Sequence, residues 1–251
     1  MRQRTQHRLI AARPLAVEAS LIITAYLAYE VVRRIVVRSP VQAIDRAMSL
    51  IRIEQRLGIF YEPNLQRFVI HHQWLVTMFN WIYIWGYLPV IGIAALYLYT
   101  RHHEFYTRYR NAFLLSGAIG LIIFATLPVA PPRMFPEFGF IDTVRGGSPV
   151  YGSVEGRHLV NEFAAVPSFH FGWILLVSLA LFQSSKVLMM RVGATLLPVM
   201  MLLTILFTAN HYLIDALAGG TIVLLALAAV RLVEKVHDAT LPMRERSRSH
   251  G

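Results

Sequence analysis

Residues 166–172 (VPSFHFG) and 210–215 (NHYLID) decide how this chain folds. Each stretch places a histidine, His170 or His211, at the edge of an apolar run long enough to cross a bilayer. Two such runs and one short basic loop separate them. Because a hairpin of two antiparallel spans returns the chain to the side it left, both histidines are predicted at one membrane face. Polar side chains gathered at one depth of a membrane bundle are costly, so they indicate a functional site.

The composition is that of an integral membrane protein. Of the 251 residues, 56% are hydrophobic and only 15% are charged, whereas soluble domains carry about 25% charged residues. The formal net charge of +10 comes from segments between the apolar runs and from both tails. That distribution favours membrane orientation and anionic headgroups over a nucleic-acid partner. Cysteine is absent, which excludes disulfides, thiolate metal sites and cysteine nucleophiles.

The apolar runs predict an all-α integral membrane fold, a six-transmembrane helix bundle in a single domain over residues 1–251. A helix needs about 20 apolar residues to cross a bilayer. The predicted spans are residues 15–37, 74–99, 112–129, 168–182, 192–208 and 212–233. Residues 41–70 instead repeat apolar positions at helical spacing with charged residues between them, which predicts an interfacial amphipathic helix.

The charge distribution also predicts an orientation. The side that holds both tails carries 14 Lys and Arg residues, and the other side carries 10. The positive-inside rule then makes residues 1–14 a basic cytoplasmic arm and residues 236–251 a cytoplasmic tail. The first apolar run lacks a small-residue cleavage site, so a retained anchor is expected. The predicted location is the plasma membrane, with several spans and the histidines on the extracytoplasmic side.

One long segment, residues 130–166, lies on the predicted outward side. It is rich in proline and glycine and carries Arg133, Arg145 and Arg157. Long irregular loops on a rigid scaffold often carry binding groups. We therefore expect an extracytoplasmic active-site loop here, within a catalytic core that covers residues 112–233.

The residues around the two histidines fit phosphoryl transfer. On a helix, His211 and Asp215 are four residues apart and share one face. The carboxylate can hold one ring nitrogen and leave the other as a nucleophile or base. Ser168 follows a proline at an expected helix start, where backbone N–H groups and the helix dipole favour a phosphate. Arg133 adds a cation with bidentate geometry, and His170 is placed to protonate a leaving oxygen.

Residues 167–170 (PSFH) and 211–215 (HYLID) resemble two motifs of the type 2 phosphatidic acid phosphatase superfamily. Those motifs are a Pro-Ser-Gly-His-like sequence and a later His-x-x-x-Asp sequence. Together with APPR at residues 130–133, they look most like the branch of inositol phosphorylceramide synthases and their bacterial relatives. The resemblance covers residues 120–220 strongly and the six-span plan loosely.

The resemblance implies a role for each residue of the site. His211 is expected to be the nucleophile that forms a phosphohistidine, with Asp215 orienting it. His170 is expected to act as the acid for the leaving group and later as the base for the acceptor. Ser168 and Arg133 are expected to hold the phosphate. The implied partners are a membrane lipid phosphate donor and an alcohol or water acceptor, with no cofactor.

The chain departs from the phosphatase branch at two places. That branch has a Lys-x6-Arg-Pro motif, but Met134 follows Arg133 here and position 126 is Thr126. It also has Ser-Arg shortly before the last histidine, where this chain has Thr204 and Ile205. Two phosphate-binding cations are therefore missing, which favours transfer to an alcohol over simple hydrolysis. Either Arg145 or Arg157 is a candidate replacement.

The predicted function is a membrane lipid phosphotransferase that moves a phosphoryl or phospho-alcohol group, with phosphoinositol as one candidate. One alternative is a lipid phosphate phosphatase acting on phosphatidic acid or a polyprenyl phosphate or diphosphate. Another is a non-enzymatic lipid transporter that uses the arginines to pass lipid phosphates.

Other chemistries have weaker support in the sequence. His170, His211 and Asp215 could supply three zinc ligands, but no HExxH or similar spacing accompanies them, and no metal is predicted. Ser168 is a weak candidate for a hydrolase nucleophile, because no G-x-S-x-G sequence surrounds it. Asn80 and Tyr83 in the second span are expected to be packing residues, and Glu18 is expected to pair with an arginine inside the bundle.

Overall fold

The computed structural model describes residues 16–32, 40–144 and 162–248, with side chains described up to residue 240. Arg145 and Arg157, the candidate replacements for the missing cations, lie outside these ranges, as does the expected arm at residues 1–14. The described residues fold almost entirely into helices. Within them, Val129 and Ala164 form an isolated parallel bridge.

The helices follow one another with short connections, apart from the long segment before α7. Residues 16–32 are helical. The later elements are α2 (Pro40–Leu57), α3 (Glu62–Ile70), α4 (Gln73–Trp81), the π-helix η1 (Ile82–Gly86), α5 (Tyr87–Arg101), α6 (His103–Thr126), the 3-10 turns η2 (Pro132–Met134) and η3 (Pro136–Phe138), α7 (Phe169–Ser184), α8 (Leu188–Phe207) and α9 (Leu213–Arg248).

Four helical segments in the described part of the chain are long and apolar enough to cross a membrane. They are Gln73–Arg101, His103–Thr126, Leu188–Phe207 and Leu213–Thr240. The apolar helix α7, Phe169–Ser184, is shorter. The all-helical membrane class is therefore confirmed, whereas the count of six spans stays a prediction.

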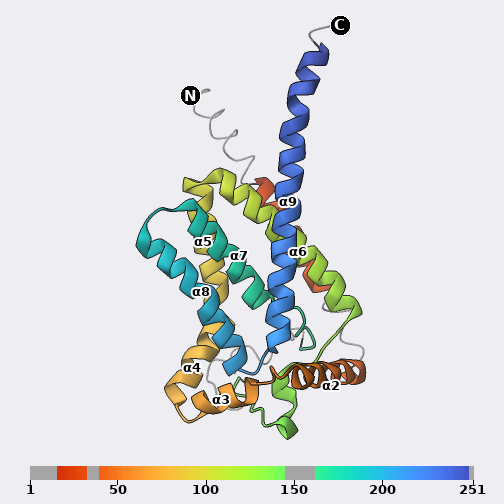
Figure 1. Ribbon diagram of the computed structural model, residues 1–251, viewed down its shortest axis with the longest axis vertical. Helices are drawn as coiled ribbons and strands as arrows, with labels where there is room; N and C mark the ends of the chain where they lie inside the picture. Colours follow the sequence, from red (N-terminus) through yellow and green to blue (C-terminus); the bar gives the residue numbers. More distant parts are fainter. Residues whose placement is uncertain (1–15, 33–39, 145–161, 249–251) are drawn as a thin grey trace.

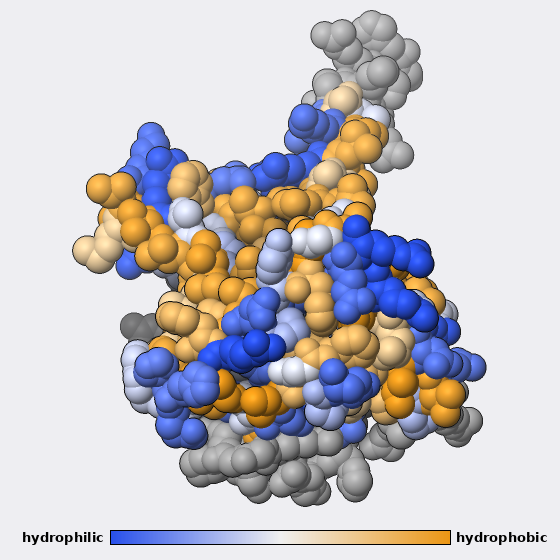
Figure 2. All heavy atoms as spheres, turned by 60° about the horizontal axis from the view of Figure 1, so that its bottom comes forward, coloured by the Kyte–Doolittle hydropathy of each residue, from blue (hydrophilic) through white to orange (hydrophobic). Residues whose placement is uncertain are grey.

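The long helices run along the long axis of the molecule, and α2 lies across one end of them (Figure 1). The first residues of α9 and the last residues of α8 lie near this end, while the α5–α6 and α7–α8 connections lie at the opposite end (Figure 1). Figure 2, turned so that the end with α2 comes forward, shows hydrophilic residues interspersed with hydrophobic ones. This mixed surface suits an element at a membrane interface.

Residues 41–70 form two helices rather than the single amphipathic helix predicted. Gly58 ends α2 with φ of +68°, a left-handed conformation that glycine adopts without steric cost. The buried face of α2 consists of residues spaced by three or four positions: Ala43, Ala47, Ile51 and Glu54. That spacing is the amphipathic pattern of a helix with one covered face. Its location in the membrane interface stays a prediction.

At the opposite end, polar contacts tie the N-terminal helix to α6. The Tyr106 hydroxyl donates to Glu18 over 2.7 Å, and the Arg110 guanidinium pairs with the same carboxylate. The expected pairing of Glu18 with an arginine is thus confirmed. A second pair, Arg108 with Glu234 at 2.7 Å, joins α6 to α9.

Helices α7 and α9 approach so closely that glycine is required where they meet. The backbone N–H of Ser168 donates to the Asp215 carbonyl over 2.9 Å. A Cβ on Gly219 would lie 2.1 Å from the Ser168 carbonyl oxygen, and one on Gly172 would lie 2.8 Å from the Gly219 oxygen. Since the obstructing atoms belong to the backbone, neither clash can be relieved by a side-chain rotation.

Replacing Gly219 with alanine should therefore destabilise the protein and displace the start of α7 from the start of α9. The expected cost is about 1–3 kcal/mol, as for other overpacked sites. The matched control is Gly193→Ala in α8, because a Cβ there meets no atom within 4 Å. Thermal unfolding in detergent, followed by tryptophan fluorescence, should show a lower Tm for Gly219→Ala only. Equal Tm values for the two variants would contradict this packing account.

Candidate active site

A tight turn after α8 delivers His211 to the start of α9. Ala209 adopts φ of +50°, which is uncommon for any residue other than glycine. The N–H groups of Asn210 and His211 both bond back to the Ile205 carbonyl, over 3.2 and 3.3 Å. These bonds reverse the chain within a few residues, so His211 is held at a fixed place before α9 begins.

The His211 ring is fixed by acceptors on one side. Its Nδ1 lies 2.8 Å from the Ala165 carbonyl oxygen and 3.3 Å from Oδ2 of Asp215. Because oxygens of both groups accept, Nδ1 must carry the hydrogen, which leaves the lone pair on Nε2. That Nε2 is buried and has no hydrogen-bond partner among the described residues. The carbonyl is thus the shorter contact, and Asp215 shares the orienting position that was predicted for it alone.

The surroundings also keep His211 uncharged. Burial lowers the pKa of His211 to about 4, and the nearby Arg133 charge lowers it further, against the hydrogen bond to Ala165. A group with a lowered pKa of this kind is neutral at pH 7 and gains its proton only in acid. A neutral imidazole with a free Nε2 lone pair is the form that can attack phosphorus.

His211 should therefore stay neutral well below the ordinary histidine pKa of about 6.5. Solid-state ¹⁵N NMR of histidine-labelled protein in lipid, with His211→Gln to assign the signal, would report its protonation. The expected result is a neutral ring at pH 6 with the hydrogen on Nδ1. A charged ring at pH 6, or a hydrogen on Nε2, would contradict the assignment.

His170 stands beside His211 and is enclosed by two tyrosines. The two histidine ring centroids are 5.7 Å apart. Tyr83 stacks on His170 with centroids 4.3 Å apart and planes 18° apart, and Tyr87 lies 4.2 Å away at a tilt of 52°. The expectation that Tyr83 only packs is therefore incomplete, since its ring also lies 6.2 Å from that of His211.

The two tyrosines that contact His170 lie in and directly after a π-helical turn. Tyr83 lies in η1, and Tyr87 is the first residue of α5. A π-helical turn widens the helix by one residue and is frequent at functional sites. The backbone of Tyr83 also hydrogen-bonds to the His170 ring. No pattern in the sequence predicts this π-helical turn, so the contacts of the two tyrosines with His170 could not be predicted from the sequence.

Ser168 occupies the N-cap position of α7, as predicted, but its backbone is already engaged. Its N–H donates to the Asp215 carbonyl. This N–H group is therefore not available to a phosphate, contrary to the expectation from the sequence. Its side-chain Oγ is buried and has no hydrogen-bond partner among the described residues. The hydroxyl, rather than the N–H, is therefore the group of Ser168 that remains to bind a ligand.

Arg133 is held against the turn that carries His211. Its Nη1 donates to Oδ1 of Asn210 over 2.6 Å, and its backbone N–H donates to the Ala209 carbonyl over 2.8 Å. Its Nε lies 3.5 Å from Oδ2 of Asp142. The guanidinium is thus fixed next to the predicted nucleophile, where a phosphate-binding cation is needed.

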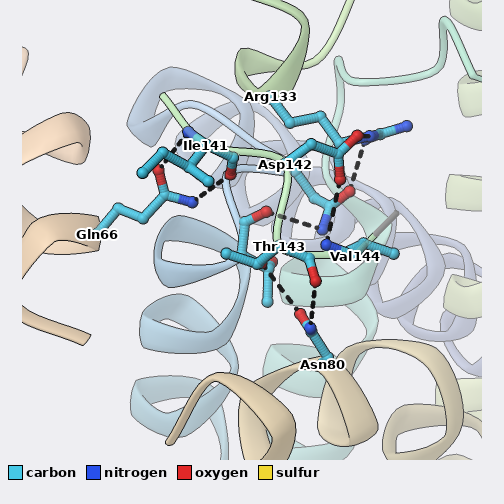
Figure 3. A network of polar contacts seen from close by, with 9 residues as sticks. Gln66, Asn80, Arg133, Ile141, Asp142, Thr143 and Val144 are labelled. Atoms are coloured by element: carbon cyan, nitrogen blue, oxygen red, sulfur yellow. Dashed lines mark hydrogen bonds and ion pairs between the residues drawn. The ribbon is translucent and has the colours of Figure 1, made fainter. Parts of the chain in front are cut away.

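The segment at residues 141–144, which supplies Asp142, is tied to two helices (Figure 3). Gln66 of α3 both donates to the Ile141 carbonyl, over 2.7 Å, and accepts from the Ile141 N–H, over 2.9 Å. Asn80 of α4 donates to the Thr143 carbonyl over 2.8 Å. Asn80, expected to be a packing residue, therefore helps to hold the segment that pairs with Arg133.

Two glutamates bind the backbone directly after His211. Neither of them was identified from the sequence. Glu62 accepts from the N–H of Leu213 over 2.8 Å, and Glu54 accepts from the N–H of Ile214 over 2.9 Å. Both carboxyl groups are buried. The available signal was the position of Glu54 on the apolar stripe of α2, where a charged residue needs a partner.

Comparison with known proteins identifies the family. A model of the PAP2 superfamily matches residues 48–229, which is most of the chain. The chain belongs to the PAP2 superfamily. The recognised resemblance is thus confirmed, and with its long apolar helices the chain is a multi-pass membrane protein.

The chain is similar to one protein that is named as a synthase. That protein is a phosphoinositol dihydroceramide synthase of Bacteroides thetaiotaomicron, 27% identical over 184 residues. The aligned region covers 67% of this chain but only 59% of the relative, so the chain matches little more than half of that protein. No solved structure matches the chain. The region matched to the PAP2 superfamily contains Glu54, Glu62 and Tyr83 as well as the residues predicted from the motifs.

Proposed function

We propose that this PAP2 protein is a lipid phosphotransferase that moves a phosphoryl or phospho-alcohol group from a lipid donor to an alcohol through a phosphohistidine. The observation that supports it most is the buried Nε2 of a neutral His211, which has no hydrogen-bond partner in the described part of the chain and lies beside a second histidine, with ring centroids 5.7 Å apart. A nucleophile next to an acid–base group is the arrangement of covalent catalysis.

The first half of the reaction forms the covalent intermediate. Nε2 of His211 attacks phosphorus while the bond from phosphorus to the donor's lipid oxygen breaks. His170 gives its proton to that leaving oxygen, and the nearby negative phosphate favours the charged form of His170 before the transfer. Arg133 and the Ser168 hydroxyl bind the other phosphate oxygens, and Asp215 stabilises the positive charge that develops on His211.

The second half reverses these roles with a new oxygen. His170, now neutral, takes the proton of the acceptor hydroxyl, whose oxygen attacks the phosphohistidine. The bond between phosphorus and Nε2 breaks, and the histidine returns to its starting form. Water in place of the alcohol would give hydrolysis, so the same residues serve the alternative of a lipid phosphate phosphatase.

Two observations favour an alcohol as acceptor. Thr126 and Ile205 occupy positions where the phosphatase branch carries cations. The synthase of Bacteroides thetaiotaomicron is named for phosphoinositol and dihydroceramide. A phosphoinositol lipid with a ceramide-type alcohol is therefore the first donor and acceptor pair to test.

The site is proposed to face outward from the plasma membrane. Lys and Arg residues gather in or near the α5–α6 and α7–α8 connections and in the later part of α9. These segments lie at the end opposite α2 (Figure 1). The positive-inside rule places such segments in the cytoplasm.

Purified protein in lipid vesicles should convert labelled phosphatidylinositol to a new phosphoinositol lipid only when a ceramide-type alcohol is added. Chelators should leave the rate unchanged, because the scheme uses protein groups alone. Phosphatidic acid and polyprenyl diphosphate serve as the comparison donors. Free phosphate released without an alcohol would make the protein a phosphatase. Neither product, together with movement of the label between leaflets, would make it a transporter.

Substitution of the two histidines should separate their roles. His211→Ala should abolish an acid-labile phosphoenzyme, because the atom that bonds phosphorus is gone. His170→Ala should slow turnover by about 10²–10⁴-fold, the usual contribution of general acid–base catalysis. Quenched single-turnover reactions with labelled donor measure both effects. Full activity of His211→Ala would exclude the covalent scheme.

A further inference from the structure

Three buried carboxyl groups from three helices meet at the start of α9. Glu54 comes from α2, Glu62 from α3 and Asp215 from α9, and each is at most 1% exposed. Each accepts one backbone N–H of the first residues of α9, with Asp215 taking that of Tyr212 over 2.9 Å. These groups bind residues 212–214, which follow His211, the proposed nucleophile. Neither glutamate belongs to the motif that contains His211.

The glutamates have one oxygen each that the backbone does not satisfy. Oε2 of Glu54 and Oε2 of Glu62 are buried and receive no hydrogen bond from the described residues. The two carboxyl groups nevertheless lie within hydrogen-bonding reach of one another. Since two carboxylates can only accept, the bond between them requires a proton on one of them. Two neighbouring carboxyl groups that cannot both ionise share a proton in this way.

The surroundings of Glu54 favour a proton on the pair. Burial, together with the charges of Glu62 and Asp215, raises the pKa of Glu54 to about 9 against the opposing effect of the hydrogen bond from Ile214. Tyr212 also faces the cluster, and burial raises its pKa, so it stays neutral. The pair of Glu54 and Glu62 therefore keeps one proton at neutral pH and loses it as pH rises through the raised pKa of Glu54.

The cluster does not have the arrangement of a metal site. Among the described residues, no group of three or more His, Cys, Asp or Glu side chains is placed to hold an ion. One oxygen of each glutamate is committed to a backbone N–H of α9 instead. The geometry therefore assigns these groups to the support of the helix end.

We propose that Glu54 and Glu62 share one proton and act as positioning residues for His211, by fixing the start of α9 from the two helices at the predicted membrane interface. This inference rests on the proposed role of His211 as nucleophile. Loss of the shared proton places two negative charges side by side, which pushes α2 and α3 apart and weakens their hydrogen bonds to the start of α9. Asp215 and His211, at the end of that helix, then lose their alignment with the Ala165 carbonyl.

The variants Glu54→Gln and Glu54→Ala distinguish positioning from simple packing. Glutamine keeps an oxygen for the Ile214 N–H and an amide that can donate to Glu62, so its kcat at pH 7 should stay within about threefold of wild type. Alanine leaves both partners unsatisfied and should lower kcat at least about tenfold with little change in KM, because alignment rather than substrate binding is lost. The control is Glu137→Gln, an exposed carboxyl group in η3.

The pH profile supplies the readout that packing would not change. In wild type and in Glu137→Gln, kcat should fall as pH rises through the pKa of Glu54. In Glu54→Gln this fall should be absent, because the amide cannot ionise. If Glu54→Ala and Glu54→Gln both keep wild-type kcat and the wild-type pH profile, the positioning role is wrong.

Infrared spectroscopy tests the shared proton without any enzyme assay. Wild-type protein at pH 7 should show the stretch of a protonated carboxyl group, shifted in D₂O, that Glu54→Gln lacks and Glu137→Gln retains. This measurement holds even if Glu54→Ala does not fold. A wild type that shows the band but neither transfers nor hydrolyses any donor would overturn the proposed function and leave the carboxyl pair standing. Absence of the band in wild type would overturn the shared proton.

Discussion

The first backbone N–H groups of a helix have no partner within the helix, and each one that is shielded from water without an acceptor costs free energy comparable to a lost hydrogen bond. Helix ends usually meet this demand with one nearby side chain. Here Asp215 accepts from Tyr212, Glu62 from Leu213 and Glu54 from Ile214. The need to satisfy these groups brings α2, α3 and α9 together at one end of the bundle.

The same helix end fixes the rest of the site. The Asp215 carbonyl accepts from the Ser168 N–H, which joins α7 to α9 at a crossing that only glycine permits. The Tyr212 hydroxyl donates to the Ala130 carbonyl over 3.2 Å, which attaches the loop before Arg133. The histidines, the serine and the arginine are therefore held by one set of contacts around the first turn of α9.

The part of this site that depends on local spacing could be predicted from the sequence. The separation of four residues predicted that His211 and Asp215 lie close together, and Nδ1 is 3.3 Å from Oδ2, although His211 precedes α9 instead of lying within it. The hairpin of spans predicted that His170 and His211 lie at the same end of the bundle, and their ring centroids are 5.7 Å apart. The break in residues 41–70 also had a local signal, because glycine at position 58 is a common helix end.

The remainder depends on contacts between distant segments, which a single sequence does not reveal. Glu54 accepts from the N–H of Ile214, 160 residues later in the chain. The Ala165 carbonyl that holds His211 is a backbone group, and every residue carries such a group, so no sequence motif identifies it. Tyr83 meets His170 from a π-helical turn, which no sequence pattern predicts. Periodicity reports which face of a helix is apolar, but it does not report what that face covers.

We propose Nε2 of His211 as the atom that attacks phosphorus, because the Ala165 carbonyl and Asp215 hold the hydrogen on Nδ1. The most direct test is to trap the phosphoenzyme from a ³²P-labelled donor and locate the phosphoryl group by tandem mass spectrometry and ³¹P NMR. We expect a phosphoramidate on Nε2 of His211. Phosphate on Nδ1 of His211 or on His170 would contradict it.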